Sequence, residues 1–164
     1  MPSLVIRQFP DPVLRAVSKP VKRIDRAVES LIKRLITAMR SQPGGVGIAA
    51  PQIGILRRIA IVDVSPKVSG AQLLILINPR IVAFEKEIIS REGCMSLPDY
   101  TANVRRAERI HIKWHDIDFK ERQLTAAGLE ARCIQHEIDH LNGLLFVDRV
   151  SSLKSDVFRR KRYL

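Results

Sequence analysis

The amino-acid sequence predicts an α+β fold, in which an antiparallel β-sheet packs around a central helix, with one helix near the N-terminus and a short helix near the C-terminus. Two observations support this prediction. The expected elements run in the order helix, several strands, helix, which is typical of α+β domains and not of alternating α/β folds. The chain has 164 residues, a length that suits one hydrophobic core. We therefore expect a single domain over residues 1–164.

The first expected helix follows an irregular arm. Residues 1–24 contain four prolines, which disfavour a continuous helix or strand. Asp25 is a residue type that caps helix N-termini, and Pro43-Gly44-Gly45 ends the helical pattern. We expect a helix from residue 25 to about residue 40. Its apolar face consists of residues that recur at helical spacing, namely Val28, Leu31, Ile32, Leu35 and Met39.

The middle of the chain is typical of β-structure. Short runs of aliphatic and β-branched residues, two of them separated by turns that contain Ser, Pro and Gly, predict strands. The expected strands cover residues 58–64, 72–78, 81–90 and 109–116. A second helical pattern runs from about residue 125 to residue 141, and Gly143 lies just beyond its end. Residues 151–162 are expected to form the short C-terminal helix.

The formal net charge of +11 is concentrated at the two ends of the chain. Residues 1–40 contain nine Lys and Arg against three acidic residues, residues 149–164 contain six against one, and residues 41–148 contain thirteen of each. Basic ends favour a polyanionic partner, because binding to phosphates releases counterions. The alternative is that both ends are solvated surfaces, and composition alone does not choose between these interpretations.

Composition also bears on location and partners. The longest apolar stretches, such as residues 73–77, are far too short to cross a membrane, and no secretory signal is evident. The two cysteines, Cys94 and Cys133, are too few for a disulfide framework. We expect a cytoplasmic protein, while an organellar location after removal of a transit peptide stays open. We also expect a monomer with neither a membrane nor a DNA partner.

The most specific motif is the HExxH sequence at residues 136–140. Residues four apart lie on one face of a helix, so His136 and His140 can bind the same metal ion. Glu137 lies beside the first histidine, where it can act on a water molecule at the metal. The alternative is a chance occurrence of HExxH in a surface helix. The apolar pattern of this helix and the glycine after it favour the metal-binding interpretation.

A catalytic site of this type normally has three protein ligands, so a third one is needed. The extended pattern HExxHxxGxxH fails because Phe146 stands at its last position, and no glutamate follows His140 to complete a thermolysin-type site. His111 and His115 alternate with apolar residues, which places them on the polar face of an expected strand. Cys94 remains as the candidate for the third ligand. An isolated cysteine is more often a small core residue, and we expect this of Cys133.

Three segments, in the same order, resemble motifs of the peptide deformylase family. Residues 45–52 (GVGIAAPQ) resemble the family motif GxGxAAxQ, residues 92–96 (EGCMS) resemble EGCLS, and residues 135–141 (QHEIDHL) resemble QHExDHL. Met95 stands where the family usually has leucine. Three motifs in order, with a complete set of metal ligands among them, make a chance resemblance implausible.

The resemblance implies a metal-dependent hydrolase domain and assigns roles to its residues. One divalent metal per chain is expected, Fe²⁺ in this family, with Zn²⁺, Ni²⁺ or Co²⁺ as alternatives. The expected ligands are Cys94, His136 and His140. Glu137 is expected to be the general base and acid, and the Gln52 amide and the Met95 backbone N–H are expected to stabilise an oxyanion. The expected substrate-binding residues are Gly45, Val46, Gly47, Leu129 and Cys133.

The implied function is hydrolytic removal of the formyl group from the N-terminal formylmethionine of nascent proteins, with release of formate. Contact of the basic ends with the ribosome fits this function. Three other functions stay open at this point. They are a deformylase-like hydrolase for another acyl peptide, a metallopeptidase of another class, and a non-enzymatic RNA-binding module with a structural zinc. The last is disfavoured, because a structural zinc site would use four protein ligands and would not need Glu137.

Overall fold

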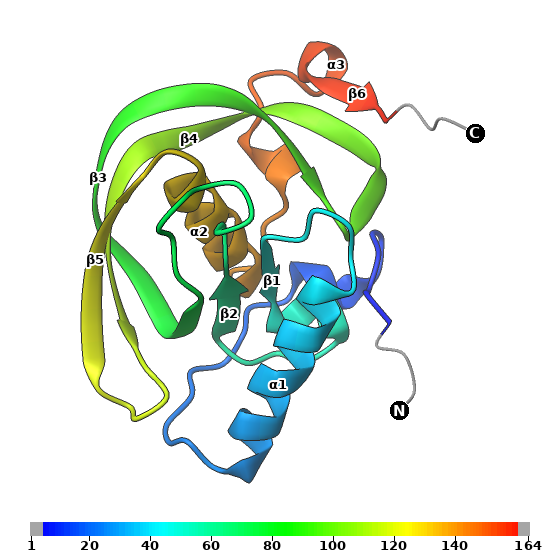
Figure 1. Cartoon of the computed structure of the whole chain (residues 1–164). Coiled ribbons are helices and arrows are strands. Elements are labelled where there is room, and N and C mark those ends of the chain that lie inside the picture. Colours follow the sequence, from blue (N-terminus) through cyan, green and yellow to red (C-terminus); the bar gives the residue numbers. More distant parts are fainter. Residues whose placement is uncertain (1–4, 161–164) are drawn as a thin grey trace.

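A computed structural model of the chain describes residues 5–160. Its helices and its antiparallel sheet confirm the mixed architecture expected from the sequence (Figure 1). Residues 1–4 of the expected arm and residues 161–162 of the expected C-terminal helix lie outside the described residues. None of the helices within residues 5–160 has the length and apolar character that crossing a membrane requires.

Helix α1 (Arg26–Arg40) lies where the helical pattern predicts it. The Asp25 side chain accepts a hydrogen bond from the Val28 backbone N–H at 2.9 Å, which satisfies one of the donors that a helix start leaves unpaired. The apolar face of α1 is buried against strands β1 (Gly47–Ala49) and β2 (Ile59–Val62). This packing fixes the position of the glycine-containing loop between α1 and β1.

The sheet has the strand order β1-β2-β3-β4-β5, and all its neighbouring strands are antiparallel. Strands β3 (Leu74–Cys94) and β4 (Leu97–His115) form one long hairpin, and β5 (Glu121–Ala127) pairs with the second half of β4. In Figure 1 these three strands curve past helix α2 (Gly128–Leu141), which contacts β1, β2, β4 and β5.

The long hairpin corrects two sequence predictions. The runs 72–78 and 81–90 are not separate strands, because the backbone continues through Asn78 in a left-handed conformation (φ 51°) and the register with β4 shifts there. The break in the pattern is therefore a bulge and not a turn. Residues 97–108 of β4 were not expected to be a strand, since the inward-facing Arg106 interrupts their apolar alternation.

Strand β5 also corrects the expected start of the second helix. Residues 125–127 belong to β5, where Thr125 pairs with His111, and α2 begins only at Gly128. Gly128 has a φ of +61°, which breaks the strand and turns the chain into the helix. Alanines at 126 and 127 fit a helix by propensity, but pairing with β4 determines their conformation.

The C-terminal segment is mostly not helical, contrary to the sequence prediction. Helix α3 covers only Leu153–Asp156, and strand β6 (Val157–Arg159) follows it and pairs with β4. Hydrogen bonding to the exposed edge of β4 outweighs the weak helical pattern of this segment. Strand β6 thereby lies beside the beginning of β4 (Figure 1).

Three groups of buried side chains hold these elements together. One lies between α1 and the β1–β2 side of the sheet, a second lies between α2 and the sheet, and a third surrounds the β3–β4 turn. The third group includes Cys94 and Leu97 from the turn and Phe146 from the segment after α2. It therefore joins the hairpin turn to the segment that follows the helix with the HExxH motif.

Candidate metal centre and active-site cleft

Two elements bring together three side chains that could hold a metal ion. α2 presents His136 and His140 one turn apart, and their ring centroids are 5.0 Å apart. The β3–β4 turn brings in Cys94, whose Sγ lies 3.3 Å from His140 Nε2. The donor atoms of the three side chains lie within 4.8 Å of one another, and no other such cluster of His, Cys, Asp or Glu occurs within residues 5–160. One sulfur and two imidazoles leave an open position at a four-coordinate metal.

A buried carboxylate fixes the orientation of the first histidine. His136 Nδ1–H donates to Glu92 Oε1 at 2.9 Å, which leaves Nε2 as the nitrogen that is available to a metal. Burial raises the pKa of Glu92, but hydrogen bonds from His136 and Arg106 outweigh it and lower the pKa to about 2. Glu92 is therefore ionised at neutral pH and holds the ring in one tautomer.

Arg106 links this carboxylate to α2. Its guanidinium donates to both Glu92 oxygens at 2.9 and 3.0 Å and to Asp139 Oδ2 at 2.6 Å. Asp139 also accepts two hydrogen bonds from Arg149, at 2.9 and 3.0 Å. The Arg106 side chain is only 2% exposed, so its charge depends on these two carboxylates. The network joins the end of β3, the middle of β4 and helix α2.

The pKa values of the two histidines shift in opposite directions. Burial lowers the pKa of His140 well below its ordinary value, which favours the neutral imidazole that binds metals. Burial acts in the same direction on His136, but the Cys94 sulfur and the Glu92 carboxylate outweigh it and raise the pKa of His136. His140 Nδ1 is buried and has no hydrogen-bond partner among the described residues.

Glu137 is a buried carboxylate beside the metal-binding cluster. Its side chain is 3% exposed, and Oε1 lies 4.0 Å from His140 Nε2 without a hydrogen-bond partner among residues 5–160. Burial raises the pKa of Glu137 to about 7, against the opposing effect of His136. A Cβ at Gly47 would lie 2.8 Å from Glu137 Oε2, so the glycine makes room for this carboxylate. The arrangement suits a group that exchanges protons near neutral pH.

The Gln52 amide is held close to Cys94. Its Oε1 accepts a hydrogen bond from the Ala49 backbone N–H at 3.0 Å, which directs Nε2 towards the β3–β4 turn. Nε2 donates to Ser96 Oγ at 3.2 Å and lies 3.6 Å from Cys94 Sγ. Gln52 is 1% exposed, so these contacts define its orientation in the absence of water.

These residues line one cleft with a volume of about 760 Å³. It contains every residue expected in the site except His140, which is buried behind the cleft wall at 1% exposure. The lining residues expected from the sequence are Gly45, Val46, Gly47, Gln52, Cys94, Met95, Leu129, Cys133, His136 and Glu137. The structure therefore brings together segments that lie up to 92 residues apart in the chain, from residue 45 to residue 137.

The expected walls of the cleft differ in character. Val46, Leu129 and Cys133 all pack at the edge of the apolar group between α2 and the sheet. Burial raises the pKa of Cys133 to about 12, so it is a neutral thiol. Arg132 lines the same cleft and lies 3.7 Å from Glu108, with its side chain 24% exposed. Residue 45 has to be a glycine for a structural reason, since a Cβ there would collide with the Met39 carbonyl oxygen.

Comparison with known proteins connects this geometry to one family. The polypeptide deformylase family model matches residues 3–156. The chain belongs to the peptide deformylase family. It is 44% identical to the peptide deformylase of Thermodesulfovibrio yellowstonii over 161 residues, covering 98% of this chain and 97% of that protein. It is also 44% identical to the peptide deformylase of Rhizobium meliloti over 154 residues, covering 93% and 88% respectively.

Solved peptide deformylase structures have the same fold. The enzyme from Legionella pneumophila aligns with a TM-score of 0.84 at 40% identity, over 91% of this chain and 86% of that one. The Synechococcus elongatus enzyme, solved in complex with actinonin, aligns with a TM-score of 0.85 at 39% identity, over 94% and 82%. Members of the family are metal-dependent hydrolases, and this chain removes the N-formyl group from nascent peptides.

Sequence reasoning missed the residues that support the deformylase site from behind. Glu92, Ser96 and Asp139 entered the sequence analysis only as letters of motifs, and Arg106 had no place in it. The presence of a charged residue inside a motif, such as Glu92 next to Gly93, was the signal that could have indicated a supporting role. Arg106 had no local signal, because its partners are 14 and 33 residues away in the sequence.

The histidines set aside during sequence analysis lie elsewhere. His111 on β4 hydrogen-bonds across to β5, with Thr125 Oγ1 at 2.8 Å and Gln123 Oε1 at 2.9 Å. His115 stacks on Phe119, with ring centroids 4.4 Å apart. Phe146 occupies the position where a metzincin would have a third histidine, and it lies nearly parallel to the His136 ring at 6.3 Å.

Proposed function

We propose that α2 is the central helix of the active site and that Cys94, His136 and His140 hold one divalent metal. A thiol and two imidazoles form a mixed donor set that Fe²⁺, Zn²⁺, Ni²⁺ and Co²⁺ all accept, and Fe²⁺ is the proposed native metal. The close approach of the three donor atoms and the unpaired, buried Glu137 Oε1 both support this assignment. When bound, the metal polarises the formyl carbonyl and lowers the pKa of a water molecule.

Glu137 is the proposed general base and acid. Its carboxylate takes a proton from the attacking water and later delivers a proton to the leaving amine nitrogen of the peptide. A pKa of about 7 suits both steps, because the group is then partly ionised and partly protonated at neutral pH. Its lack of a hydrogen-bond partner among the described residues also fits a group that pairs with the reacting water.

Two donors are proposed to stabilise the developing oxyanion. The Gln52 amide is held by Ala49 and faces the turn that carries Cys94. The backbone N–H of Met95 follows Cys94 directly in that turn. Because this second donor belongs to the backbone, the methionine in place of the usual leucine leaves the role unchanged. Donors that are fixed before the reaction are worth more than mobile ones, because they need no reorganisation.

The methionine of the substrate is proposed to bind against Val46, Leu129 and Cys133. These three residues are apolar members of the cleft wall, which also contains Glu137 and His136. Gly47 contributes by leaving room for the Glu137 carboxylate, and Gly45 holds the glycine segment against the end of α1. The peptide backbone of the substrate is proposed to run beside this segment.

The experiment that tests this mechanism is the substitution Glu137→Gln. Glutamine keeps the size of the side chain but cannot accept the proton, so formate release from formyl-Met-Ala-Ser should fall by about 10²–10⁴-fold. Metal content, measured on anaerobically purified protein, should stay close to one ion per chain. The proposal is wrong if the variant retains its metal and releases formate at the parent rate.

The surroundings of the enzyme are proposed from its charge and substrate. We infer that it acts as a monomer in the cytoplasm and meets nascent chains at the ribosome. The excess of positive charge in residues 1–40 and 149–164 supports contact with ribosomal RNA. This contact is separate from catalysis, so ribosome co-sedimentation tests it independently of formate release.

A further inference from the structure

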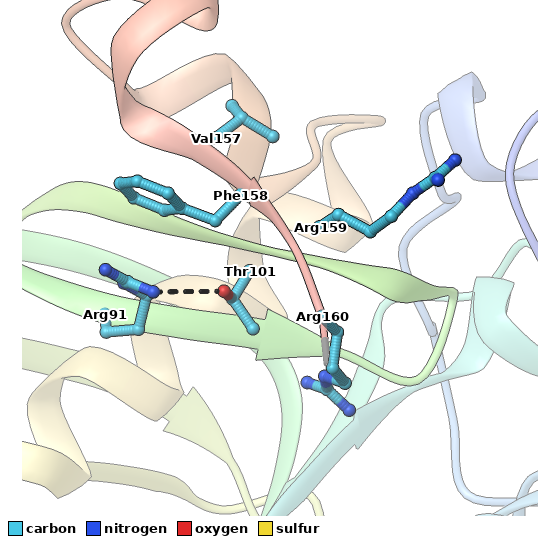
Figure 2. A pocket seen from close by; sticks show the side chains of 6 residues that line it. All are labelled: Arg91, Thr101, Val157, Phe158, Arg159 and Arg160. Carbon is cyan, nitrogen blue, oxygen red and sulfur yellow. Dashed lines mark hydrogen bonds between the residues drawn. The ribbon is translucent and has the colours of Figure 1, made fainter. Parts of the chain in front are cut away.

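Strand β6 brings the C-terminal segment to the mouth of the cleft. It pairs with the beginning of β4, with Phe158 opposite Thr101, and the Arg160 N–H donates to the Asp99 carbonyl oxygen at 2.7 Å. The Arg91 guanidinium lies 4.0 Å from the centre of the Phe158 ring, in a cation–π contact. Figure 2 shows Arg91, Thr101 and Phe158, with Arg160 at the end of the segment. Together the contacts fix where the chain places Arg160.

Arg160 extends over Gly93, at the end of β3. A Cβ at residue 93 would lie 2.2 Å from Arg160 Nη2, so the guanidinium occupies the space in which any other residue would place its side chain. Gly93 directly precedes Cys94 in the proposed metal centre. Arg160 lines both the cleft and the neighbouring pocket of about 640 Å³ under β6. In Figure 2 its side chain points away from that of Arg159.

The charged groups at the mouth of the cleft are predominantly cationic. The two acidic lining residues are occupied or inaccessible, since Glu92 pairs with Arg106 and His136, and Glu137 is buried. Arg132 pairs with Glu108. The remaining charged residues of the lining are Lys67, Arg91 and Arg160. A peptide that leaves the cleft through this mouth therefore passes a positive electrostatic potential.

We propose that Arg160 is a specificity-determining residue that favours formylated peptides with an acidic side chain soon after the methionine. This inference rests on the deformylase function. The formyl group lies at the metal centre and the methionine lies against the apolar wall, so the following residues have to pass the mouth where Arg160 stands. Its guanidinium can donate two hydrogen bonds to one carboxylate.

The expected size of the preference is small, because Arg160 is exposed. Ion pairs at exposed sites change an equilibrium by about 1.4- to 5-fold. The contact lies away from the reacting bond and is equally strong in the ground state and the transition state. It should therefore change KM and leave kcat almost constant, and high salt should weaken it.

The test compares kcat/KM for formyl-Met peptides that carry glutamate or glutamine at the second, third or fourth residue. The peptides are amidated at the C-terminus, so that no α-carboxylate competes for the arginine. In the parent enzyme at low salt, glutamate should be preferred by about two- to fivefold at one or more positions. Arg160→Gln should remove the preference and Arg160→Lys should retain most of it. Arg159→Gln is the matched control, because it removes the same charge from the adjacent residue, whose side chain does not line the cleft.

Three results would overturn the inference. These results are a ratio of one at every position in the parent enzyme, an unchanged preference in Arg160→Gln, and an equal loss of the preference in Arg159→Gln. The last result would mean that only the overall charge matters. Failure of the underlying function gives a different result, in which the parent releases no formate even from the glutamine peptides.

Discussion

Two neighbouring arginines of β4 show how differently the inner wall and the outer surface of this protein hold charge. Arg106 faces inwards, and its side chain and those of its partners Glu92 and Asp139 are 2%, 12% and 8% exposed. Arg105 faces outwards and pairs with Glu87, with side chains 50% and 57% exposed. The pleat of one strand thus sorts adjacent residues of one type into two environments.

The buried arginine helps to position a proposed metal ligand, whereas the exposed arginine does not. On the inner wall each charged side chain has an oppositely charged partner. Arg106 hydrogen-bonds to Glu92, which in turn hydrogen-bonds to His136. Removing one member leaves an unpaired buried charge, which is costly. On the outer surface water replaces a lost partner, so the same change costs little. We expect catalysis and stability to depend on the inner wall and selectivity among substrates to depend on the rim.

The largest expected effect comes from the ligands themselves. Cys94→Ser should lose its metal on dialysis and with it nearly all formate release, because a serine hydroxyl is a poor ligand where a thiolate is needed. Cys133→Ser is the matched control. Cys133 is a neutral thiol in the cleft wall, so this variant should keep one metal per chain. Equal metal content in the two variants, measured by elemental analysis, would mean that Cys94 is not the third ligand.

The next effect directly tests the comparison between the two arginines. Arg106→Gln should lower the free energy of unfolding by about 3–5 kcal/mol, the usual cost of breaking a buried ion pair. Arg105→Gln should lower it by about 0–1 kcal/mol. Urea unfolding of both variants measures the difference. If the two variants unfold at the same urea concentration as each other, the buried network does not have the role described here.

The residues of the candidate metal site were easier to predict from the sequence than the hydrogen-bond network that supports them. His136 and His140 lie four apart in one helix, so their proximity follows from helical geometry alone. Cys94 was found by elimination together with a family resemblance, and its approach to His140 depends on the whole β3–β4 hairpin. Arg106 could not be found, because its role arises only when the hairpin and α2 pack together.

The fold shows the same limit. Helix α1 was predicted well, because its cap and its apolar face are both local features. The hairpin was predicted only in pieces, since the bulge near Asn78 resembles a turn in sequence. The segments 125–127 and 157–159 were assigned to helices, yet each forms a strand by pairing with β4. Pairing between distant segments overrides weak local propensity in both places.

Substitutions of two glycines test the same difference between the inner wall and the rim of the cleft. Gly47→Ala places a methyl group against the buried Glu137 carboxylate, and Gly93→Ala places one against the exposed Arg160 guanidinium. Glu137 has little room to move, and a shift of about 1 Å in a reacting group costs about 10²-fold in rate. We expect Gly47→Ala to lower kcat by about that factor. Gly93→Ala should lower it far less, because a flexible arginine can turn aside.

Formate release at saturating substrate, with metal content measured in parallel, distinguishes the two variants. An unchanged kcat in Gly47→Ala would show that the position of Glu137 does not depend on this glycine. A comparable loss in both variants would show that the flexible rim matters as much as the buried wall.

The smallest expected effect concerns the basic ends. Deleting the C-terminal segment would be a poor test, because β6 pairs with β4 beside the cleft. Lys154 and Arg159 are exposed, and replacing both with glutamine removes charge while leaving the strand in place. Ribosome co-sedimentation should weaken by a few-fold, and the slope of log K against log salt should decrease by roughly one for each phosphate contact that is lost.

The matched control for this pair removes two exposed lysines, Lys86 and Lys120, from the middle of the chain. Both double variants change the net charge equally, so a general charge effect would weaken co-sedimentation in both. A specific contact of the C-terminal segment should weaken it only when Lys154 and Arg159 are replaced. Turnover of a short formylated peptide should stay at the parent level in both, because none of these four side chains lines the cleft. Unchanged co-sedimentation of the Lys154 and Arg159 variant would remove the C-terminal segment from the ribosome contact.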